Sequence, residues 1–330
     1  MGFSCIGSFA YMPFKKKILY CLFSGFIFIP VAFSQYKFEK PVVIGSELGF
    51  RFNNIRSVIK GNDGFMWLGT SEGLCRFDGQ QVKTIKLTDN FNNAPFTNSV
   101  FAVLPVESEI WAGTSQGLSV MNSRDYTFRH YQFTENGKSD SLKRSIDQQV
   151  SVLHCDRFGT LWVGTRRGIC MYDEAKDNFQ FFSHSKKEFP PLFPSLGSDI
   201  AILSIESSKT NDSVIWAGTA AGLQEINQYS GRVRLYTFPQ QNKDYQVALN
   251  AFRRLYHHDD GLLYVGSWAA GVNVFNPVKA TFTPLEVKSE NGKRIFSKPI
   301  EGICRKNDHE IWITSVAGLA IYDLKLKDIV

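Results

Sequence analysis

The densest group of potential metal ligands in the sequence is His257–Asp260, which reads His-His-Asp-Asp. Imidazole and carboxylate groups are common zinc ligands in proteins. The group follows a short apolar run, and the pairs Asn62–Asp63 and Asn307–Asp308 follow similar runs elsewhere in the chain. Because Asn and Asp favour turns, we interpret the group as a solvated turn and predict no metal site.

Carboxylates that would act in pairs are not evident. A glycosidase needs two carboxyl groups converging at about 5 to 9.5 Å, and nothing in the sequence pairs the scattered glutamates Glu47, Glu72, Glu107, Glu135, Glu188, Glu206 and Glu225. The chain also has no G-x-S-x-G nucleophile motif, and its glycines do not form a phosphate loop between a strand and a helix. We therefore expect neither catalysis nor a cofactor, with a propeller glycosidase or lyase as the enzymatic alternative.

A second group of residues suits binding instead of catalysis. Arginine makes forked hydrogen bonds to anions, and tryptophan offers a ring on which a sugar stacks. The candidate ligand-binding residues are Arg166, Arg167, Trp268, Gln116 and Glu72. Each lies a few residues after a tryptophan or tyrosine, at a variable position inside a motif that recurs along the chain. An ordinary solvated loop tip is the alternative interpretation for all five.

The motif that positions these residues is W-x-G-T-x-x-G followed by apolar residues. Six copies begin at Trp67, Trp111, Trp162, Trp216, Tyr264 and Trp312. The separations between starts are 44, 51, 54, 48 and 48 residues, which is the period of a four-stranded propeller blade. The sequence therefore predicts an all-β fold, a β-propeller of four-stranded blades with six visible repeats. The blades are expected near residues 50–87, 98–133, 148–183, 199–238, 250–286 and 300–330.

Within each repeat we expect strands A to D in chain order. An apolar run such as Ile55–Ile59 forms strand A near the axis, an Asp four residues before the tryptophan begins the turn, and strand B carries the tryptophan as a wedge between blades. The glycine two residues after the tryptophan lets the neighbouring blade approach closely. The glycine six residues after it permits the positive φ of a tight B–C hairpin. The B–C tips and the D–A connections share one rim, where binding residues of a rigid scaffold usually lie.

The amino terminus has the features of an export signal. Lys15–Lys17 precede the apolar run Ile18–Phe33, and Ala32–Ser34 places cleavage before Gln35. We therefore predict a signal peptide at 1–34, a propeller at 35–330, a periplasmic location and no membrane span after cleavage. Without the three lysines, the mature chain has 34 basic and 31 acidic residues. This near balance gives no electrostatic reason to expect nucleic-acid binding.

The string from Ile55 to Gly79, IRSVIKGNDGFMWLGTSEGLCRFDG, resembles the two-component regulator propeller repeat. The resemblance covers about Ile44–Asp323 and implies the periplasmic sensor half of a Bacteroidetes hybrid two-component regulator. Such propellers usually have seven blades and are followed by membrane, kinase and receiver segments, so the resemblance favours a truncated seven-bladed ring. A six-bladed ring closed by Tyr36–Ile44 as an outer strand is the alternative.

The function implied by this resemblance is ligand sensing without catalysis. The expected ligand is an oligosaccharide, and the expected partner is a second copy in a homodimer or a downstream sensor kinase segment. A protein-interaction scaffold without a small ligand is the alternative from a different class. The identity of the ligand, the oligomeric state, the blade number and the relation to a longer regulator stay open at this level.

Overall fold

The computed structural model describes residues 46–49, 54–87, 97–133, 148–166, 168–182, 201–238, 250–285 and 299–330. These residues form six four-stranded antiparallel sheets, each paired in chain order. The helical elements with bounds in these ranges are two short 3-10 turns, η1 (Ser46–Leu48) and η2 (Glu174–Lys176). The prediction of a β-propeller with four-stranded blades is confirmed. The predicted signal peptide and the Tyr36–Ile44 segment lie outside the described residues.

The six blades have the following strands. Blade 1 holds β1 (Ile55–Lys60), β2 (Met66–Thr70), β3 (Gly73–Phe77) and β4 (Val82–Ile85), and blade 2 holds β5 (Val100–Val106), β6 (Glu109–Thr114), β7 (Gly117–Asn122) and β8 (Phe128–Tyr131). Blade 3 holds β9 (Val150–Cys155), β10 (Leu161–Thr165), β11 (Gly168–Asp173) and β12 (Asn178–Phe182), and blade 4 holds β13 (Ile202–Ser207), β14 (Val214–Thr219), β15 (Leu223–Asn227) and β16 (Val233–Tyr236). Blade 5 holds β17 (Phe252–His257), β18 (Leu263–Ser267), β19 (Val272–Asn276) and β20 (Thr281–Pro284), and blade 6 holds β21 (Ile300–Arg305), β22 (Glu310–Ser315), β23 (Gly318–Asp323) and β24 (Asp328–Ile329).

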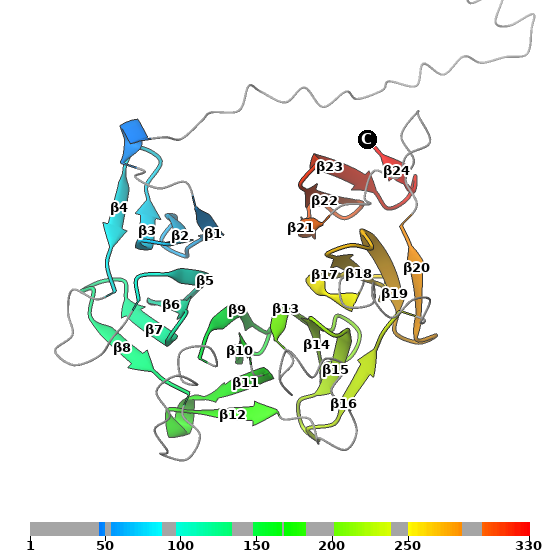
Figure 1. Ribbon diagram of the computed structural model, residues 1–330, viewed down its shortest axis with the longest axis horizontal. Helices are drawn as coiled ribbons and strands as arrows, with labels where there is room; N and C mark the ends of the chain where they lie inside the picture. Colours follow the sequence, from blue (N-terminus) through cyan, green and yellow to red (C-terminus); the bar gives the residue numbers. More distant parts are fainter. Residues whose placement is uncertain are drawn as a thin grey trace, which may run out of the picture. The chain divides into compact units, whose positions relative to one another are not determined.

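Strand A of each blade lies on the inner side of the curved row of blades (Figure 1). The contacts run from β1 to β5, β9, β13, β17 and β21 in turn, so each strand A touches the strand A of the next blade. Strands β4, β8, β12, β16 and β20 lie on the outer side (Figure 1). The repeat period in the sequence therefore corresponds to one step around the propeller.

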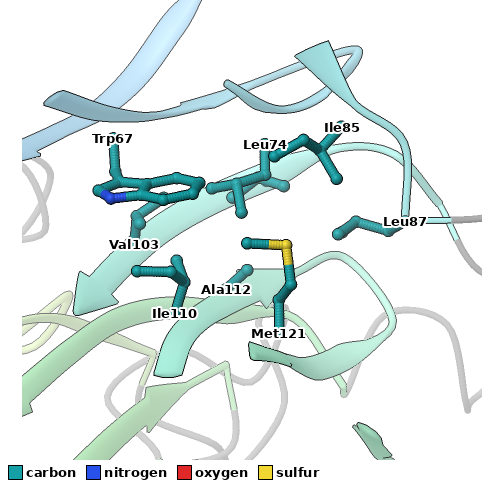
Figure 2. Close-up of a cluster of buried hydrophobic side chains, with 9 residues drawn as sticks. Trp67, Leu74, Ile85, Leu87, Val103, Ile110, Ala112 and Met121 are labelled. Atoms are coloured by element: carbon teal, nitrogen blue, oxygen red, sulfur yellow. The ribbon is translucent and has the colours of Figure 1, made fainter. Parts of the chain in front are cut away.

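The motif tryptophans fill the space between blades. Trp67 is fully buried and packs with Val103 and Ile110 of blade 2, together with residues of its own blade (Figure 2). Trp111, Trp162 and Trp216 are at most 3% exposed. An indole ring buries about 150 to 250 Å², so these side chains make up a large part of each interface between blades. The prediction that the motif tryptophans act as wedges is confirmed for these four, whereas Trp312 of blade 6 is only partly buried.

The glycine two residues after the tryptophan provides room for the next blade. A Cβ on Gly113 would lie 2.6 Å from Val150 Cγ1, and a Cβ on Gly266 would lie 2.6 Å from Ile300 Cγ2. Val150 and Ile300 each begin the strand A that follows. Blade 6 has Thr314 at this position and a glycine, Gly302, opposite it in β21. A Cβ on Gly302 would lie 2.5 Å from the Thr314 hydroxyl oxygen, so the small residue has moved to the partner strand.

The A–B turns differ from the expectation in detail. Asp63 and Asp260 accept hydrogen bonds from the backbone N–H groups of Phe65 and Leu262, as predicted. In blades 4 and 6 the turn acceptors are the neighbouring asparagines, Asn211 and Asn307, rather than Asp212 and Asp308. Asn has a short side chain with a carbonyl oxygen, so it accepts the same local hydrogen bond as Asp. In these two turns the acceptor therefore lies one residue earlier than expected and is Asn instead of Asp.

The face of blade 1 that points away from blade 2, and the face of blade 6 that points away from blade 5, are less covered than the faces between blades. In β1, Ile55 is 42% and Val58 is 56% exposed, whereas Val100 and Val103 at the equivalent positions of β5 are at most 5% exposed. In β23, Leu319 is 57% exposed, although the equivalent leucine or isoleucine of blades 1 to 4 is buried. Two apolar sheet faces are therefore uncovered in the part of the chain that the structure describes.

Candidate functional site

The B–C hairpins form a rigid rim. The threonine that ends strand B donates from Oγ1 to the carbonyl oxygen of the hairpin glycine, as in Thr70 to Gly73 at 2.8 Å and Thr114 to Gly117 at 2.9 Å. The same hydroxyl oxygen accepts the backbone N–H of the second tip residue, Glu72 or Gln116. Gly73 and Gly117 have φ values of +137° and +112°, a region in which glycine carries no steric penalty. The motif threonine thus holds the backbone while the tip side chains remain variable.

The sequence-predicted binding residues lie on the tips of separate blades. Glu72 is exposed between β2 and β3, Gln116 is half-buried between β6 and β7, and Arg166 is exposed between β10 and β11. Trp268 follows β18 and is 48% exposed. Arg167 lies outside the described residues. Among the four described, no hydrogen bond or ring contact joins one to another, so they share a rim without forming a single cluster.

Trp268 has partners that the sequence reasoning missed. The guanidinium carbon of Arg253, in β17, lies 4.6 Å from the centroid of the Trp268 ring. Arg253 Nη1 also donates to Glu301 Oε1, in β21 of the next blade, at 3.0 Å. The Trp268 backbone N–H donates to the Ala251 carbonyl oxygen at 3.1 Å. The indole is therefore held against the start of its own strand A and next to an ion pair between blades.

A β-bulge explains why Arg253 reaches this position. In every blade the pairing of strands A and B skips the second residue of strand A. A bulge bends the strand and redirects the extra side chain. The six bulge residues are Arg56, Phe101, Ser151, Leu203, Arg253 and Glu301. Bulge residues of adjacent blades are in contact at two places. The Arg56 guanidinium lies 4.1 Å from the centroid of the Phe101 ring, and Arg253 donates a hydrogen bond to Glu301.

Arg254 adds a second cation beside the pair. Its Nε donates to the Glu301 carbonyl oxygen at 2.6 Å, and its Nη1 donates to the Arg253 carbonyl oxygen at 2.7 Å. Burial lowers the pKa of Arg254, Arg253 lowers it further, and Glu301 acts in the opposite direction. The corner between blades 5 and 6 thus holds two guanidinium groups and one carboxylate. A charged residue at the second position of an otherwise apolar strand A was the available sequence signal.

The opposite rim holds the histidines considered as metal ligands. His257 is fully buried and His258 is 8% exposed, so the interpretation as a solvated turn is wrong for the two histidines, whereas Asp259 and Asp260 do lie on an exposed turn. His257 Nδ1 accepts the backbone N–H of Lys209 at 3.0 Å, and His258 Nδ1 lies 3.2 Å from the Tyr256 hydroxyl oxygen. Packing against blade 4 explains the burial. The described ranges contain no group of three His, Cys, Asp or Glu side chains suited to a metal ion.

Two partly buried titratable groups, Glu206 and His154, lie near His257. Burial raises the pKa of Glu206 to about 7, against opposing effects of Lys209 and the His257 backbone N–H. Burial lowers the pKa of His154 to about 4, and its Nε2 lies 2.6 Å from Ser207 Oγ. These groups connect the strands A of blades 3, 4 and 5 on the rim opposite to Trp268. Their shifts have a structural origin in desolvation between blades.

Comparison with known proteins supports the resemblance seen in the sequence. A family model described as two component regulator propeller matches residues 49–72. No curated protein matches the chain significantly. Within the described ranges, no helix is long and apolar enough to cross a membrane.

Several solved structures share the fold. The extracellular domain of the putative hybrid two component system BT3049 from B. thetaiotaomicron matches with a TM-score of 0.64 and 25% identity, over 86% of this chain and 36% of that one. The extracellular domain of the putative one component system BT4673 from the same organism matches with a TM-score of 0.55 and 16% identity, over 83% of this chain and 39% of that one. PorZ of Porphyromonas gingivalis, described as a surface component of the type-IX secretion system, matches with a TM-score of 0.56 and 12% identity, over 82% of this chain and 38% of that one.

The chain therefore spans between 36% and 39% of the length of these structures. The two matches below 25% identity bear on the fold alone. The match to BT3049 and the family model agree with each other and with the repeated motif. The chain is thus a β-propeller of four-stranded blades that carries the two-component regulator propeller repeat and is similar to the extracellular domain of a hybrid two-component system.

Proposed function

We propose that this protein is a periplasmic sensory propeller that binds an oligosaccharide on its B–C rim and performs no catalysis. Its similarity to the extracellular domain of a hybrid two component system supports a sensor role. The export signal expected at 1–34 supports the location. Signalling then depends on a partner, either a second copy of the chain or a downstream sensor kinase segment that receives the ligand-dependent change.

The observation that carries the proposal is the placement of Trp268. This residue is 48% exposed on a rim whose backbone is fixed by hydrogen bonds, and Arg253 holds its ring at 4.6 Å. Sugar sites combine an aromatic surface with a few well-placed polar groups. A rigid, half-exposed indole beside a guanidinium supplies both at one corner of the propeller.

A protein-interaction scaffold is the second candidate. The uncovered apolar residues Ile55 and Val58 of blade 1 and Leu319 of blade 6 favour it, because exposed apolar surface is typical of protein contacts. The resemblance to PorZ is one of fold and adds no support for a secretion role. The two candidates differ in what they bind, and a binding experiment separates them.

The test is calorimetric titration of the full chain with a panel of neutral and acidic oligosaccharides, together with W268A and Y229A. Tyr229 is 76% exposed on a turn of blade 4, so Y229A controls for the loss of any exposed aromatic ring. Binding that is lost in W268A and kept in Y229A supports the sensor proposal. Heat-silent titrations beside a stable protein complex favour the scaffold, and sugar released from any substrate contradicts the absence of catalysis.

A further inference from the structure

We propose that the corner formed by Trp268, Arg253 and Glu301 selects an anionic sugar, one whose ring stacks on the indole while its acid group bonds Arg253. This inference rests on the proposed function, since it names the ligand class for the same rim. It goes further in predicting that charge, rather than ring shape alone, determines which oligosaccharides bind.

The geometry places a cation and a ring surface side by side. Arg253 lies over the Trp268 ring and its side chain is 26% exposed, while about half of Trp268 faces solvent. A guanidinium has several N–H donors in a planar fork. The bond to Glu301 uses Nη1, so the fork retains donors that suit a second carboxylate or a sulfate. Arg253 covers one face of the indole, so the sugar would stack on the solvent-exposed part of the ring and its acid group would reach past the ring edge to this fork.

The local charge is unbalanced toward positive. Arg253 and Arg254 face the single carboxylate of Glu301, whose side chain is 39% exposed. Arg254 already donates from Nε and Nη1 to the carbonyl oxygens of Glu301 and Arg253. Burial is the main cause of the lowered pKa of Arg254, and the neighbouring Arg253 cation lowers it further. An incoming anion offsets the repulsion between these two cations, whereas a neutral sugar hydroxyl does so only weakly.

Blade 5 is built differently from the other blades at this point. Its B–C hairpin is one residue longer than those of the other blades. Ser267 Oγ accepts the Ala270 backbone N–H at 2.5 Å, and Asn273 Nδ2 donates to the Ala270 carbonyl oxygen at 3.2 Å. These bonds hold the longer tip in shape. Trp268 is thus presented by an ordered hairpin instead of a loose one, which reduces the entropy lost when a ligand binds.

The experiment compares matched acidic and neutral probes on the full chain. Oligogalacturonides are titrated beside their methyl-esterified, uncharged forms, and sulfated galactan oligosaccharides beside their desulfated forms. We expect an acidic probe to bind at least about tenfold more tightly than its neutral counterpart, with an affinity that falls as salt is raised. The carboxylate and sulfate pairs distinguish the two sources of negative charge.

Three variants test which side chains cause the preference for acidic probes. R253Q should reduce the affinity for the acidic probe by about tenfold or more while changing that for the neutral probe little. W268A should weaken both. R305Q is the matched control, because Arg305 also bridges blades 5 and 6, through Asp259 on the opposite rim, and its loss should leave sugar affinity unchanged.

Each outcome is decisive. If neutral and acidic probes bind equally and both depend on Trp268, the anion inference is wrong and the proposed sugar-binding function stands. If R253Q keeps the full preference for acidic probes, Arg253 does not select the anion. If no probe binds the wild-type chain at millimolar concentration, both the inference and the oligosaccharide proposal fail.

Discussion

Replacing Gly113 by alanine should destabilise the contact between blades 2 and 3. The new Cβ would lie 2.6 Å from Val150 Cγ1 and 3.0 Å from both the Cβ and the carbonyl oxygen of Val150. Val150 is fully buried and paired with Thr165 in blade 3, so its backbone has little freedom to retreat. Overpacking of this kind typically costs about 1 to 3 kcal/mol. Gly113 has no positive φ, so the effect reports packing and not backbone strain.

Urea unfolding followed by tryptophan fluorescence measures this change. The midpoint should fall while the slope of the free energy with urea stays constant, which indicates a loss of stability without a change in the surface exposed on unfolding. V150A alone should cost about 0.5 to 2 kcal/mol by leaving a cavity. The double variant G113A/V150A should cost less than the sum of the two by about 0.5 kcal/mol or more, since the smaller side chain removes part of the clash.

Thr314→Ala provides the control, because blade 6 already has a Cβ at the equivalent position of strand B. Its free energy of unfolding should change by less than about 1 kcal/mol. Wild-type stability of G113A, or strict additivity in the double variant, would refute the argument that this glycine exists to admit the next blade.

Three further predictions concern polar groups. The pKa of His154 is lowered to about 4 from 6.5, so the unfolded state binds more protons than the folded state between these two pH values. The free energy of unfolding should therefore fall as the pH drops through this window. H154Q should flatten that dependence, measured by urea unfolding at several pH values. The pKa of Glu206 is raised to about 7 from 4.5, so the folded state binds more protons than the unfolded state between these two pH values. The free energy of unfolding should therefore fall as the pH rises from 4.5 to 7, and E206Q should remove this loss. A pH profile of stability that E206Q leaves unchanged would contradict the burial of Glu206. Asp156 accepts hydrogen bonds from the Trp162 indole N–H at 3.2 Å and from two turn N–H groups, so D156A should lower the free energy of unfolding by about 1 to 3 kcal/mol. D212A, on the exposed turn of blade 4, is the control and should change this free energy by about 0.5 kcal/mol or less. Equal losses in the two variants would show that the buried hydrogen bonds of Asp156 do not contribute.

Much of the blade architecture was predictable because it repeats along the chain. Trp67 and its equivalents, the following glycines and the apolar strand A occur at nearly constant offsets in the sequence. Each feature satisfies a local requirement of a sheet covered on both faces, so the type and order of the strands follow from residue patterns. The close approach at Gly113 is a further case, since only glycine suits that distance.

The candidate site was predictable only in part. Trp268 was found from its place on a hairpin tip, but its partner Arg253 was not, because a β-bulge redirects that side chain out of the usual alternation. The burial of His257 was also missed. Its turn has the composition of an exposed one, and the backbone of Lys209 in the preceding blade covers it.

The sequence by itself determined the period, the strands within each period and the residues that separate one blade from the next, because these depend on side-chain size and backbone freedom over a few positions. The tertiary structure alone decided which charges meet. Arg253 and Glu301 are 48 residues apart and become neighbours only when two blades pack. Side-chain pairing across blades depends on the rotation between sheets and on where a bulge directs the chain, and neither is encoded in any one repeat.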